Sequence, residues 1–194
     1  VAKPIAWVLD KTLGEELKVI WTKRELEHII SMHEDDPRSG VDADEERIIL
    51  GALRFSEKTA KQVMTPRGRV FMLSSGDMLG EKLLERVQME GFTRIPVYEE
   101  EKEEVVGLIF AKDLLGIESA RSIAGIMRTD RLVRVTPGRK LDEILNLMIA
   151  RRSHMALVTE KNGTFVGIVT LEDVIEEIIG REIHDEDDDA PPSS

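Results

Sequence analysis

Cysteine is absent from the 194-residue sequence, so disulfide bonds, thiolate metal sites and cysteine nucleophiles are excluded together. Long apolar runs are absent as well: no stretch approaches the roughly 18 consecutive apolar residues of a membrane-spanning helix, and no secretory signal peptide is visible. The 4 histidines show no HExxH or comparable metal-binding spacing, and the sequence contains neither a GxSxG elbow nor a Walker A loop. We therefore expect a binding protein and not an enzyme.

Basic residues are the minority among the charged ones. The 27 Lys and Arg residues stand against 38 Asp and Glu residues, which gives a formal net charge of −11. Sequence-independent binding to nucleic acid requires a basic face that neutralises phosphates, so we expect no nucleic-acid partner. Residues 184–194 (HDEDDDAPPSS) are acidic and then rich in Pro and Ser, which predicts a solvated, disordered tail.

Residues 1–57 are predicted to form a charged helical segment. Residues 4–14 (PIAWVLDKTLG) have apolar side chains at helical spacing, which is typical of an ordinary amphipathic helix or of one beside a membrane, and the ordinary helix is favoured. Two further helices, in TKRELEHIISMHED and DADEERIILGALRF, are separated by the turn sequence DPRSG, and Asp42 or Asp44 is expected to cap the second. The chain begins with Val1 and not with methionine, so we expect a fragment of a longer protein.

The sequence repeats itself beyond residue 58. QVMTPRGRVFML resembles GIMRTDRLVRV, and RIPVYEEEKEEVVGLIFAKDLLG resembles HMALVTEKNGTFVGIVTLEDVIEE. The second alignment matches Gly107 with Gly167 and Asp113 with Asp173, both 60 residues apart. The chain therefore contains two units of about sixty residues.

Each unit has the pattern of a strand, an amphipathic helix, a two-stranded hairpin and a closing helix. In the first unit these elements are predicted at 69–73, 78–89, 94–100, 105–110 and 111–116. In the second they are predicted at 132–136, 141–150, 154–160, 164–170 and 171–180. Asn162 and Gly163 lie between the hairpin strands of the second unit and predict a two-residue turn with positive φ angles.

Such a unit leaves a hydrophobic face of its sheet uncovered, and pairing two units about a pseudo-twofold axis buries both faces. We therefore predict an α+β fold with two paired domains, residues 58–120 and 121–183. An N-terminal helical segment, residues 1–57, precedes the pair, and the acidic tail follows it.

Five stretches carry a resemblance to a known family: VMTPR (63–67), FTRIPVYE (92–99), VVGLIFAKDLL (105–115), RRSHMALV (151–158) and GIVTLEDVIEEIIG (167–180). Together they resemble a tandem pair of CBS domains (a Bateman module), and in detail the cytosolic part of the CNNM/CorC family of magnesium and cobalt transporters. The resemblance implies a regulatory module that binds Mg-ATP and forms a homodimer. It also implies a transmembrane divalent-cation transport domain upstream in the same polypeptide, with this module on the cytoplasmic side of the cell membrane.

A nucleotide cleft requires a carboxylate for the ribose hydroxyls, a hydroxyl near the α-phosphate, an apolar slot for adenine and cations for the phosphates. The resemblance assigns the ribose to Asp173 and the junction of ribose and phosphate to Thr170. The residues that it assigns to the adenine side are Thr65, Phe92, Thr93, Arg94, Ile95 and Pro96. Arg94 is also a candidate for a phosphate contact, and His154 is a further one.

The alternative for Thr170 and Asp173 is that they cap the helix that follows Thr170. A threonine followed three residues later by an acid has the spacing of a capping box, and such a cap is worth about 1 kcal/mol. Capping asks nothing of Thr65 or Arg94, whereas a nucleotide site needs all four residues around one cleft. With the family resemblance, nucleotide binding is favoured.

The two units differ at the position of Thr170. The first unit has Phe110 there, although Asp113 is retained. A phenyl ring donates no hydrogen bond to a phosphate, so we predict one competent and one degenerate nucleotide site. ATP adds roughly four negative charges to an already acidic chain, and a Mg²⁺ ion on the phosphates offsets them, so we expect Mg-ATP as the ligand. The sequence does not identify the protein ligands of this ion.

Two other functions stay open at this point. One is a stand-alone soluble adenine-nucleotide sensor or interaction scaffold with no transporter attached, which an upstream reading frame with several apolar spans would exclude. The other is an ATP-hydrolysing enzyme, which the lack of a positioned nucleophile disfavours.

Overall fold

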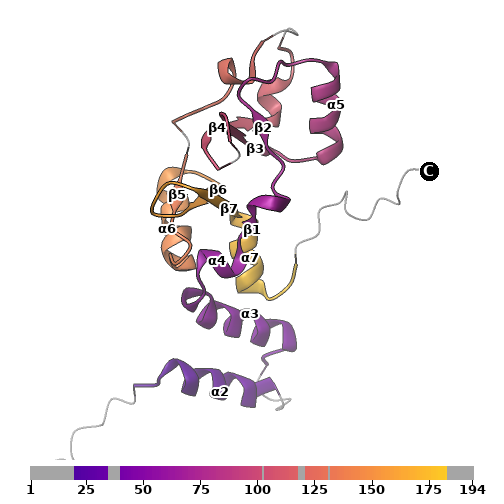
Figure 1. Cartoon of the computed structure of the whole chain (residues 1–194). Coiled ribbons are helices and arrows are strands. Elements are labelled where there is room, and N and C mark those ends of the chain that lie inside the picture. The colour runs from indigo at the N-terminus through magenta and orange to yellow at the C-terminus, as the bar shows by residue number, and fades with distance from the viewer. Residues whose placement is uncertain (1–19, 35–39, 102, 118–120, 131, 183–194) are drawn as a thin grey trace, which may run out of the picture. The chain divides into compact units, whose positions relative to one another are not determined.

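The computed structural model describes residues 20–34, 40–101, 103–117, 121–130 and 132–182 (Figure 1). Three predicted features lie wholly or mostly outside these residues, namely the helix at 4–14, the turn at 36–40 and the acidic tail at 184–194. The chain divides into two compact units, Val1–Glu46 and Arg47–Ser194.

The described part of the first unit contains helix α2 (Lys23–Glu34) and the first turn of helix α3 (Ala43–Arg54). Asp42 Oδ1 accepts the backbone N–H groups of Asp44 and Glu45 at 2.9 and 2.8 Å. These are donors that an uncapped helix would leave without partners. The two predicted helices are therefore present, and Asp42 caps the second of them.

The second unit holds two sheets, one for each sequence repeat (Figure 1). One sheet has the order β2-β3-β4, with bounds Leu73–Ser74, Arg94–Tyr98 and Val105–Phe110. The other has the order β1-β7-β6-β5, with bounds Thr65–Pro66, Phe165–Thr170, Met155–Thr159 and Arg134–Val135. The α-helices that begin in this unit are α4 (Ala60–Val63), α5 (Glu81–Glu90), α6 (Leu141–Arg151) and α7 (Leu171–Ile179). Short 3-10 turns are η1 (Phe55–Glu57), η2 (Arg67–Arg69), η3 (Ala111–Leu114) and η4 (Ile123–Gly125). The predicted α+β fold of two related units is confirmed.

Each repeat adds its first segment to the sheet of the other repeat. Strand β1, at the start of the first repeat, pairs antiparallel with β7, so that Thr65 lies opposite Ile168. In the other sheet Arg128, at the start of the second repeat, forms a bridge opposite Leu108 of β4. Neither sheet is therefore complete without a segment from the other half of the sequence.

Glycine allows this exchange at both places. A Cβ atom on Gly167 would lie 2.5 Å from the carbonyl oxygen of Thr65, and one on Gly107 would lie 2.7 Å from Met127 Sδ. A larger side chain at either position would push the incoming segment off the sheet. The two glycines that the repeat alignment matches thus have the same packing role.

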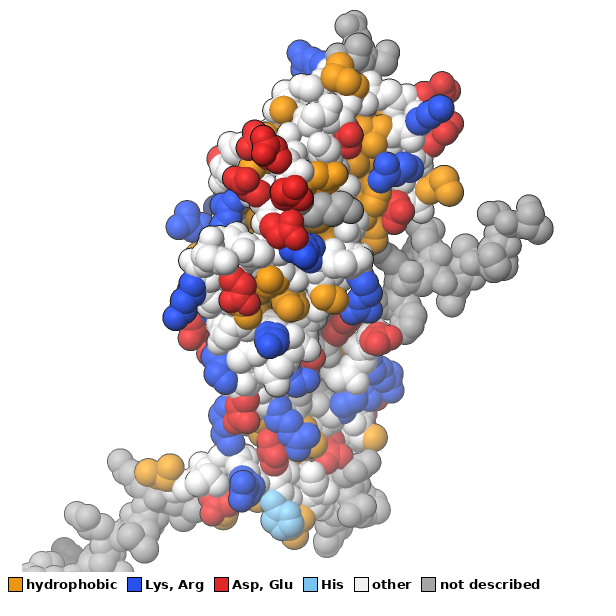
Figure 2. Space-filling view, viewed as in Figure 1, with side chains coloured by type: hydrophobic (Ala, Val, Ile, Leu, Met, Phe, Trp, Pro, Cys, Tyr) orange, Lys and Arg blue, Asp and Glu red, His pale blue; other side chains and the backbone are white. Residues whose placement is uncertain are grey.

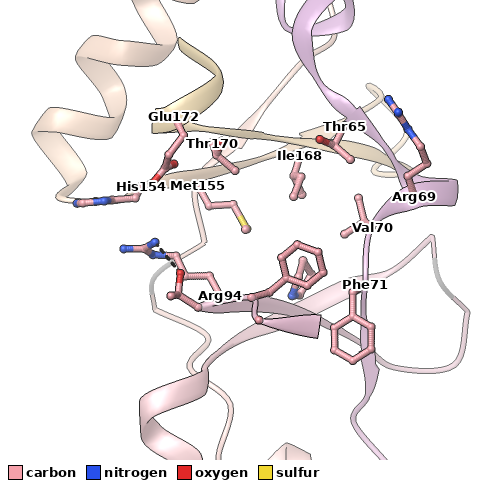
Figure 3. A pocket seen from close by; sticks show the side chains of 14 residues that line it. Thr65, Arg69, Val70, Phe71, Arg94, His154, Met155, Ile168, Thr170 and Glu172 are labelled. Atoms are coloured by element: carbon pink, nitrogen blue, oxygen red, sulfur yellow. Dashed lines mark hydrogen bonds between the residues drawn. The ribbon is translucent and has the colours of Figure 1, made fainter. Parts of the chain in front are cut away.

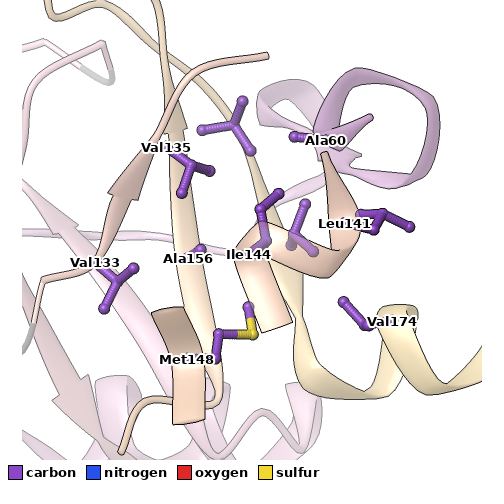
Figure 4. Packing of buried hydrophobic residues seen from close by; sticks show 10 residues of the cluster. Ala60, Val133, Val135, Leu141, Ile144, Met148, Ala156 and Val174 are labelled. Carbon is purple, nitrogen blue, oxygen red and sulfur yellow. The ribbon is translucent and has the colours of Figure 1, made fainter. Parts of the chain in front are cut away.

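The core of the second repeat lies between α6 and its sheet (Figure 4). Leu141, Ile144 and Met148 are at most 1% exposed, and their spacing gives α6 one apolar face. Ala156 of β6 packs in the same cluster, and so does Ala60, which lies at the start of the first repeat. The start of the first repeat is thus part of the second repeat's core.

Two further clusters complete the interior of the unit. The core of the first repeat consists of Leu73, Leu79, Val87, Ile95, Val97, Ile109, Leu114 and Ile123. A cluster of Met72, Val105, Leu157 and Phe165 joins the two repeats. Phe165 is fully buried there, and its N–H donates to the carbonyl of Glu103 at 2.9 Å, so the contact between repeats is both apolar and hydrogen-bonded.

Three local predictions were wrong. The strand expected at 69–73 is limited to β2 at Leu73–Ser74, and Arg69 belongs to the 3-10 turn η2. The first repeat closes with the four-residue turn η3 and not with a helix over 111–116, and Phe110 at its start has no side-chain oxygen to cap it. In the hairpin of the second repeat Gly163 has a φ of +91°, but Asn162 has a negative φ. The N–H of Gly163 donates to the carbonyl of Glu160 at 2.9 Å, so the turn spans four residues and ends on the glycine.

The later part of α3 packs on the last turn of α7. A Cβ atom on Gly51 would lie 2.1 Å from the carbonyl oxygen of Ile178, so the two helices approach through a bare glycine backbone. Arg47 Nε donates to the carbonyl of Ile179 at 2.8 Å, which satisfies a group that a helix end leaves open. Within the second unit, the part of α3 from Arg47 onward is therefore held against the helix that begins after Thr170.

Gly51→Ala is expected to destabilise the protein by about 1–3 kcal/mol, as overpacking of a tight contact does. Alanine is the better helix former by about 1 kcal/mol, but this gain is smaller than the cost of a clash with a backbone carbonyl. Thermal melting followed by circular dichroism measures the effect. Gly68→Ala is the matched control, because Gly68 lies in the 3-10 turn η2 with open space around its Cβ position. An unchanged or raised melting temperature for Gly51→Ala would contradict the packing.

Candidate functional site

A pocket lies between the two repeats and takes residues from both (Figure 3). Its volume is about 270 Å³, near the lower end of the ~300–1,000 Å³ range of small-molecule sites. The residues that line it are Thr65, Arg69, Val70, Phe71, Gly91, Phe92, Thr93, Arg94, Pro96, His154, Met155, Ile168, Thr170 and Glu172. The exchanged strand β1 brings Thr65 into the wall formed by β7.

The structure brings most of the predicted site residues together. Those that line the pocket are Thr65, Phe92, Thr93, Arg94, Pro96, His154 and Thr170. Ile95 does not, because side chains alternate along β3 and this one is fully buried in the core of the first repeat. Asp173 does not either: it lines a separate depression with Gln62 and Glu176.

Sequence reasoning missed seven of the lining residues: Arg69, Val70, Phe71, Gly91, Met155, Ile168 and Glu172. Ile168 shares a face of β7 with Thr170, so strict alternation along the strand was the signal that pointed to it. Glu172 follows Thr170 by two residues in the first turn of α7. For Arg69, Val70 and Phe71 there was no local signal, because their place depends on the exchange of segments between repeats.

Thr170 ends β7 and caps α7. Its Oγ1 accepts the N–H of Asp173 at 3.2 Å, and its own N–H donates to Asp173 Oδ2 at 2.7 Å, so the two residues form a capping box. The capping alternative is therefore present in the structure. The Thr170 hydroxyl thus serves the cap and the Asp173 carboxylate, and the Thr170 side chain also lines the pocket.

Burial raises the pKa of the Asp173 carboxyl above its ordinary value of 3.8, and the hydrogen bonds from Thr170 oppose that rise. The neighbouring carboxylates Glu172 and Glu177 raise it further. The ionised form is thus less well solvated in the folded protein than in the unfolded chain. Two hydroxyl donors from a ligand would stabilise it.

Apolar and aromatic side chains form one side of the pocket. The rings of Phe71 and Phe92 stack with centroids 6.1 Å apart, and the Phe92 side chain remains 48% exposed. The Arg86 guanidinium lies over the Phe71 ring, 5.2 Å from its centroid, which is a cation–π contact. Figure 3 shows Val70 next to Phe71 along the chain and Ile168 on the strand across the pocket, so a flat apolar group fits between apolar walls.

Charged side chains stand around the same space. Figure 3 places His154 and Arg94 together on one side of the pocket and Arg69 on the other. Arg94 donates to the Thr93 hydroxyl at 3.3 Å. Glu172 is the one carboxylate that lines this pocket among the described residues. Elsewhere on the face shown in Figure 2, acidic and basic side chains are interspersed, so these cations are a local feature of an acidic chain.

The strand register corrects one detail of the repeat alignment. Arg94 lies opposite Phe110 in the first repeat, and Met155 lies opposite Thr170 in the second. The structural counterpart of Arg94 is therefore Met155, and not His154 as the letter-by-letter alignment gave.

In the part of the chain that the structure describes, no cluster of three or more His, Asp or Glu side chains is arranged to hold a metal ion. Within the same residues, no helix combines the length and apolar character needed to cross a bilayer. The pocket is thus the feature of the described residues best suited to a ligand.

Comparison with known proteins defines the class first. The CBS domain model matches residues 60–119 and again 122–180, so the chain belongs to the CBS domain family and carries two CBS repeats.

The type of CBS pair follows from solved structures and curated relatives. The chain is similar to the CBS domain of the bacterial CNNM/CorC family Mg²⁺ transporter, with 32% identity and a TM-score of 0.75 over 86% of this chain and all of that one. A structure of that domain in complex with ATP matches at 34% identity and a TM-score of 0.65, over 71% of this chain and 98% of that one. Protein MAM3 of Saccharomyces cerevisiae is 32% identical over 193 residues, 97% of this chain and 27% of the yeast protein. The recognition of a CNNM/CorC-type CBS pair is confirmed, and the chain spans about a third or less of the curated relatives it matches.

The raised pKa of Asp173 predicts a pH-dependent effect of Asp173→Asn. An acid whose pKa is raised on folding favours the folded state below its ordinary pKa, and this contribution is lost as pH rises through the raised value. Asparagine keeps an acceptor for the Thr170 N–H and never ionises. We therefore expect the melting temperature of the variant, relative to wild type, to be higher near about pH 7 than near about pH 3.5.

Melting curves at both pH values measure this difference. Glu160→Gln is the control, because it removes one charge from an exposed residue outside the capping box and is not among the groups that shift the Asp173 pKa. A melting-temperature difference between Asp173→Asn and wild type that is the same at both pH values would contradict the burial of an ionised carboxylate.

Proposed function

We propose that the chain is a regulatory module that binds Mg-ATP in the pocket between its CBS repeats. The observation that carries the proposal is the lining of this pocket: two threonine side chains, a stacked pair of phenylalanine rings and arginine side chains surround one space. A hydroxyl donor, an aromatic slot and cations around one space are the groups that an adenine nucleotide requires. The bound structure of a similar CBS domain with ATP supports the choice of nucleotide.

The pocket suggests how the nucleotide lies. Adenine fits against Phe71, Phe92 and Ile168, because a flat ring system stacks on aromatic faces and is otherwise poorly solvated. The ribose and α-phosphate then reach Thr65 and Thr170. Because the pocket is small for a whole nucleotide, the outer phosphates extend toward its rim.

Asp173 lines the neighbouring depression and not the pocket, so the ribose is expected to reach past Thr170 to its carboxylate, which would then serve both the cap and the ribose. Its Oδ2 accepts one N–H from Thr170, and an ionised carboxylate has about four acceptor positions on its two oxygens. Hydrogen bonds from ribose hydroxyls would offset the burial that now raises its pKa. Arg94 and His154 stand on one side of the pocket as partners for the phosphates.

Glu172 favours Mg-ATP over free ATP. A carboxylate beside polyphosphate is repulsive unless a divalent cation lies between them. Mg²⁺ prefers phosphate oxygens, waters and one or two carboxylates, and Glu172 is the carboxylate that lines this pocket in the described chain. The ion would thus arrive with the nucleotide and meet one protein ligand.

A homodimer is part of the proposal. Met89 of α5 is 87% exposed and Ile149 of α6 is 65% exposed, and both lie in the last turn of the long helix of their repeat. Exposed apolar side chains on the two related helices suit a contact with a second copy.

The module is further proposed to control a transmembrane divalent-cation transport domain of the same polypeptide, from the cytoplasmic side of the cell membrane. The similar bacterial domain belongs to a Mg²⁺ transporter, and the chain spans 27% of the yeast relative. Helix α7 joins the pocket to α3, because Thr170 begins it and Gly51 packs on its last turn. Regulation then requires that nucleotide binds one conformation of this joint more tightly than another.

Thr170→Val is expected to weaken Mg-ATP binding at least about tenfold, which corresponds to ~1.4 kcal/mol. The variant loses the donor to the ligand and also the helix cap, so calorimetric titration needs a control that loses a cap alone. Thr59→Val supplies it: Thr59 precedes α4 in a capping box with Gln62 and does not line the pocket.

Both variants should lose similar stability, but only Thr170→Val should lose affinity. Equal affinities in the two variants would remove Thr170 from the site. The absence of adenine-nucleotide binding to the wild-type chain would refute the proposed function itself. Phosphate release that disappears in Asp173→Ala would instead indicate an ATP-hydrolysing enzyme.

Glu172→Gln is expected to reverse the preference for magnesium. Without the carboxylate, free ATP should bind several-fold more tightly than it binds to wild type, because a repulsion is removed. Mg-ATP should bind more weakly, because a ligand of the ion is lost. Titrations with and without Mg²⁺ measure both changes, and parallel shifts in the two series would contradict the role of Glu172.

A further inference from the structure

The first-repeat cleft is defined as the place in the first repeat where the counterparts of Thr65, Thr170 and Asp173 lie. The strand registers define the correspondence: Thr65 lies opposite Ile168 of β7, and Arg128 lies opposite Leu108 of β4, which is the repeat counterpart of Ile168. Arg128 therefore occupies the position of Thr65. Phe110 and Asp113 likewise occupy the positions of Thr170 and Asp173, because the closing segments of the two repeats are 60 residues apart.

Both repeats have a carboxylate at this position, and in the first repeat a side chain of the same protein binds it. Arg128 Nε donates to Asp113 Oδ2 at 2.8 Å, and its terminal nitrogen donates to Asp113 Oδ1 at 2.9 Å, so the pair is bidentate. The Arg128 guanidinium also lies 4.9 Å from the centroid of the Phe110 ring. Arg128 thus contacts both residues that correspond to the ribose and phosphate contacts of the other pocket.

The difference between the two carboxylates begins at the helix start. Thr170 offers a hydroxyl to the N–H of Asp173, and the two residues form a capping box. Phe110 has no such group, and η3 begins without a side-chain cap, so the Asp113 carboxylate turns to Arg128. Both Asp113 oxygens then carry charge-assisted bonds, which are roughly twice as strong as neutral ones.

We propose that Arg128 is the specificity-determining residue that closes the first-repeat cleft to nucleotide, by occupying Asp113 as a built-in ligand. This inference rests on the proposed nucleotide binding. It makes Arg128, and not Phe110 alone, the reason that only one of the two sites binds nucleotide. Phe110 alone does not exclude a nucleotide, because an aromatic ring is a favourable platform for a base. A ribose in this cleft would have to displace a bidentate guanidinium from a carboxylate whose side chain is 22% exposed.

The test converts the first cleft to the residues of the second. Arg128→Thr with Phe110→Thr recreates two threonines beside Asp113, as in the set of Thr65, Thr170 and Asp173. Isothermal titration of the full chain with Mg-ATP should show one site per chain in wild type and in Phe110→Thr, and two in the double variant. Two sites in Phe110→Thr alone would overturn the proposal, and so would one site in a double variant that melts cooperatively.

A second arm needs no nucleotide and separates this inference from the proposed function. In a double-mutant cycle of Asp113→Asn and Arg128→Gln, each single change and their combination should lower the melting temperature by a similar few degrees, because the pair acts as a unit. Additive losses would overturn the role of Arg128 as the occupant of Asp113. If the wild-type chain binds no nucleotide while the melting-temperature losses of the cycle are non-additive, the proposed function is wrong. The role of Arg128 as the occupant of Asp113 is then still supported.

Discussion

The exchange of first segments between the repeats is the constraint on which the rest of the structure depends. Strand β1 pairs with β7 because Gly167 leaves room for the backbone at Thr65. The same pairing places Ala60 in the core of the second repeat and carries Thr65 to the pocket wall. The pocket thus exists only where both repeats are folded and joined, so a ligand bound there stabilises the pair and not a single repeat.

The pocket and the helix that leaves it share one side chain. Thr170 stabilises the start of α7 through its oxygen, and its side chain also lines the pocket, so helix capping and the proposed ligand binding meet at one residue. In the first repeat the same position holds Phe110, the closing helix shrinks to four residues, and Arg128 takes the carboxylate. A change at one residue thus accompanies a change in helix length and in the occupant of the cleft.

The fold and much of the site were predictable from sequence because their signals are local or repeated. Apolar spacing indicated α6, and the repeat indicated two related sheets. Thr170 and Asp173 have a spacing that indicates a cap whatever else they do. Ile95 was wrongly predicted to line the pocket, although alternation along the strand already placed its side chain in the core. Arg69 and Phe71 were missed, because they reach the pocket through the segment exchange, which no local pattern encodes. The pairing of Arg128 with Asp113 depends on the same exchange.

The central claim is that an adenine nucleotide occupies the pocket between the repeats and leaves the first-repeat cleft empty of ligand. A crystal structure of the chain grown with saturating Mg-ATP tests it most directly. The account predicts one nucleotide per chain, with adenine against Phe71 and Phe92, the ribose at Asp173, and the Arg128–Asp113 pair unbroken. An empty pocket at saturating nucleotide, or a nucleotide bound at Asp113, would contradict it.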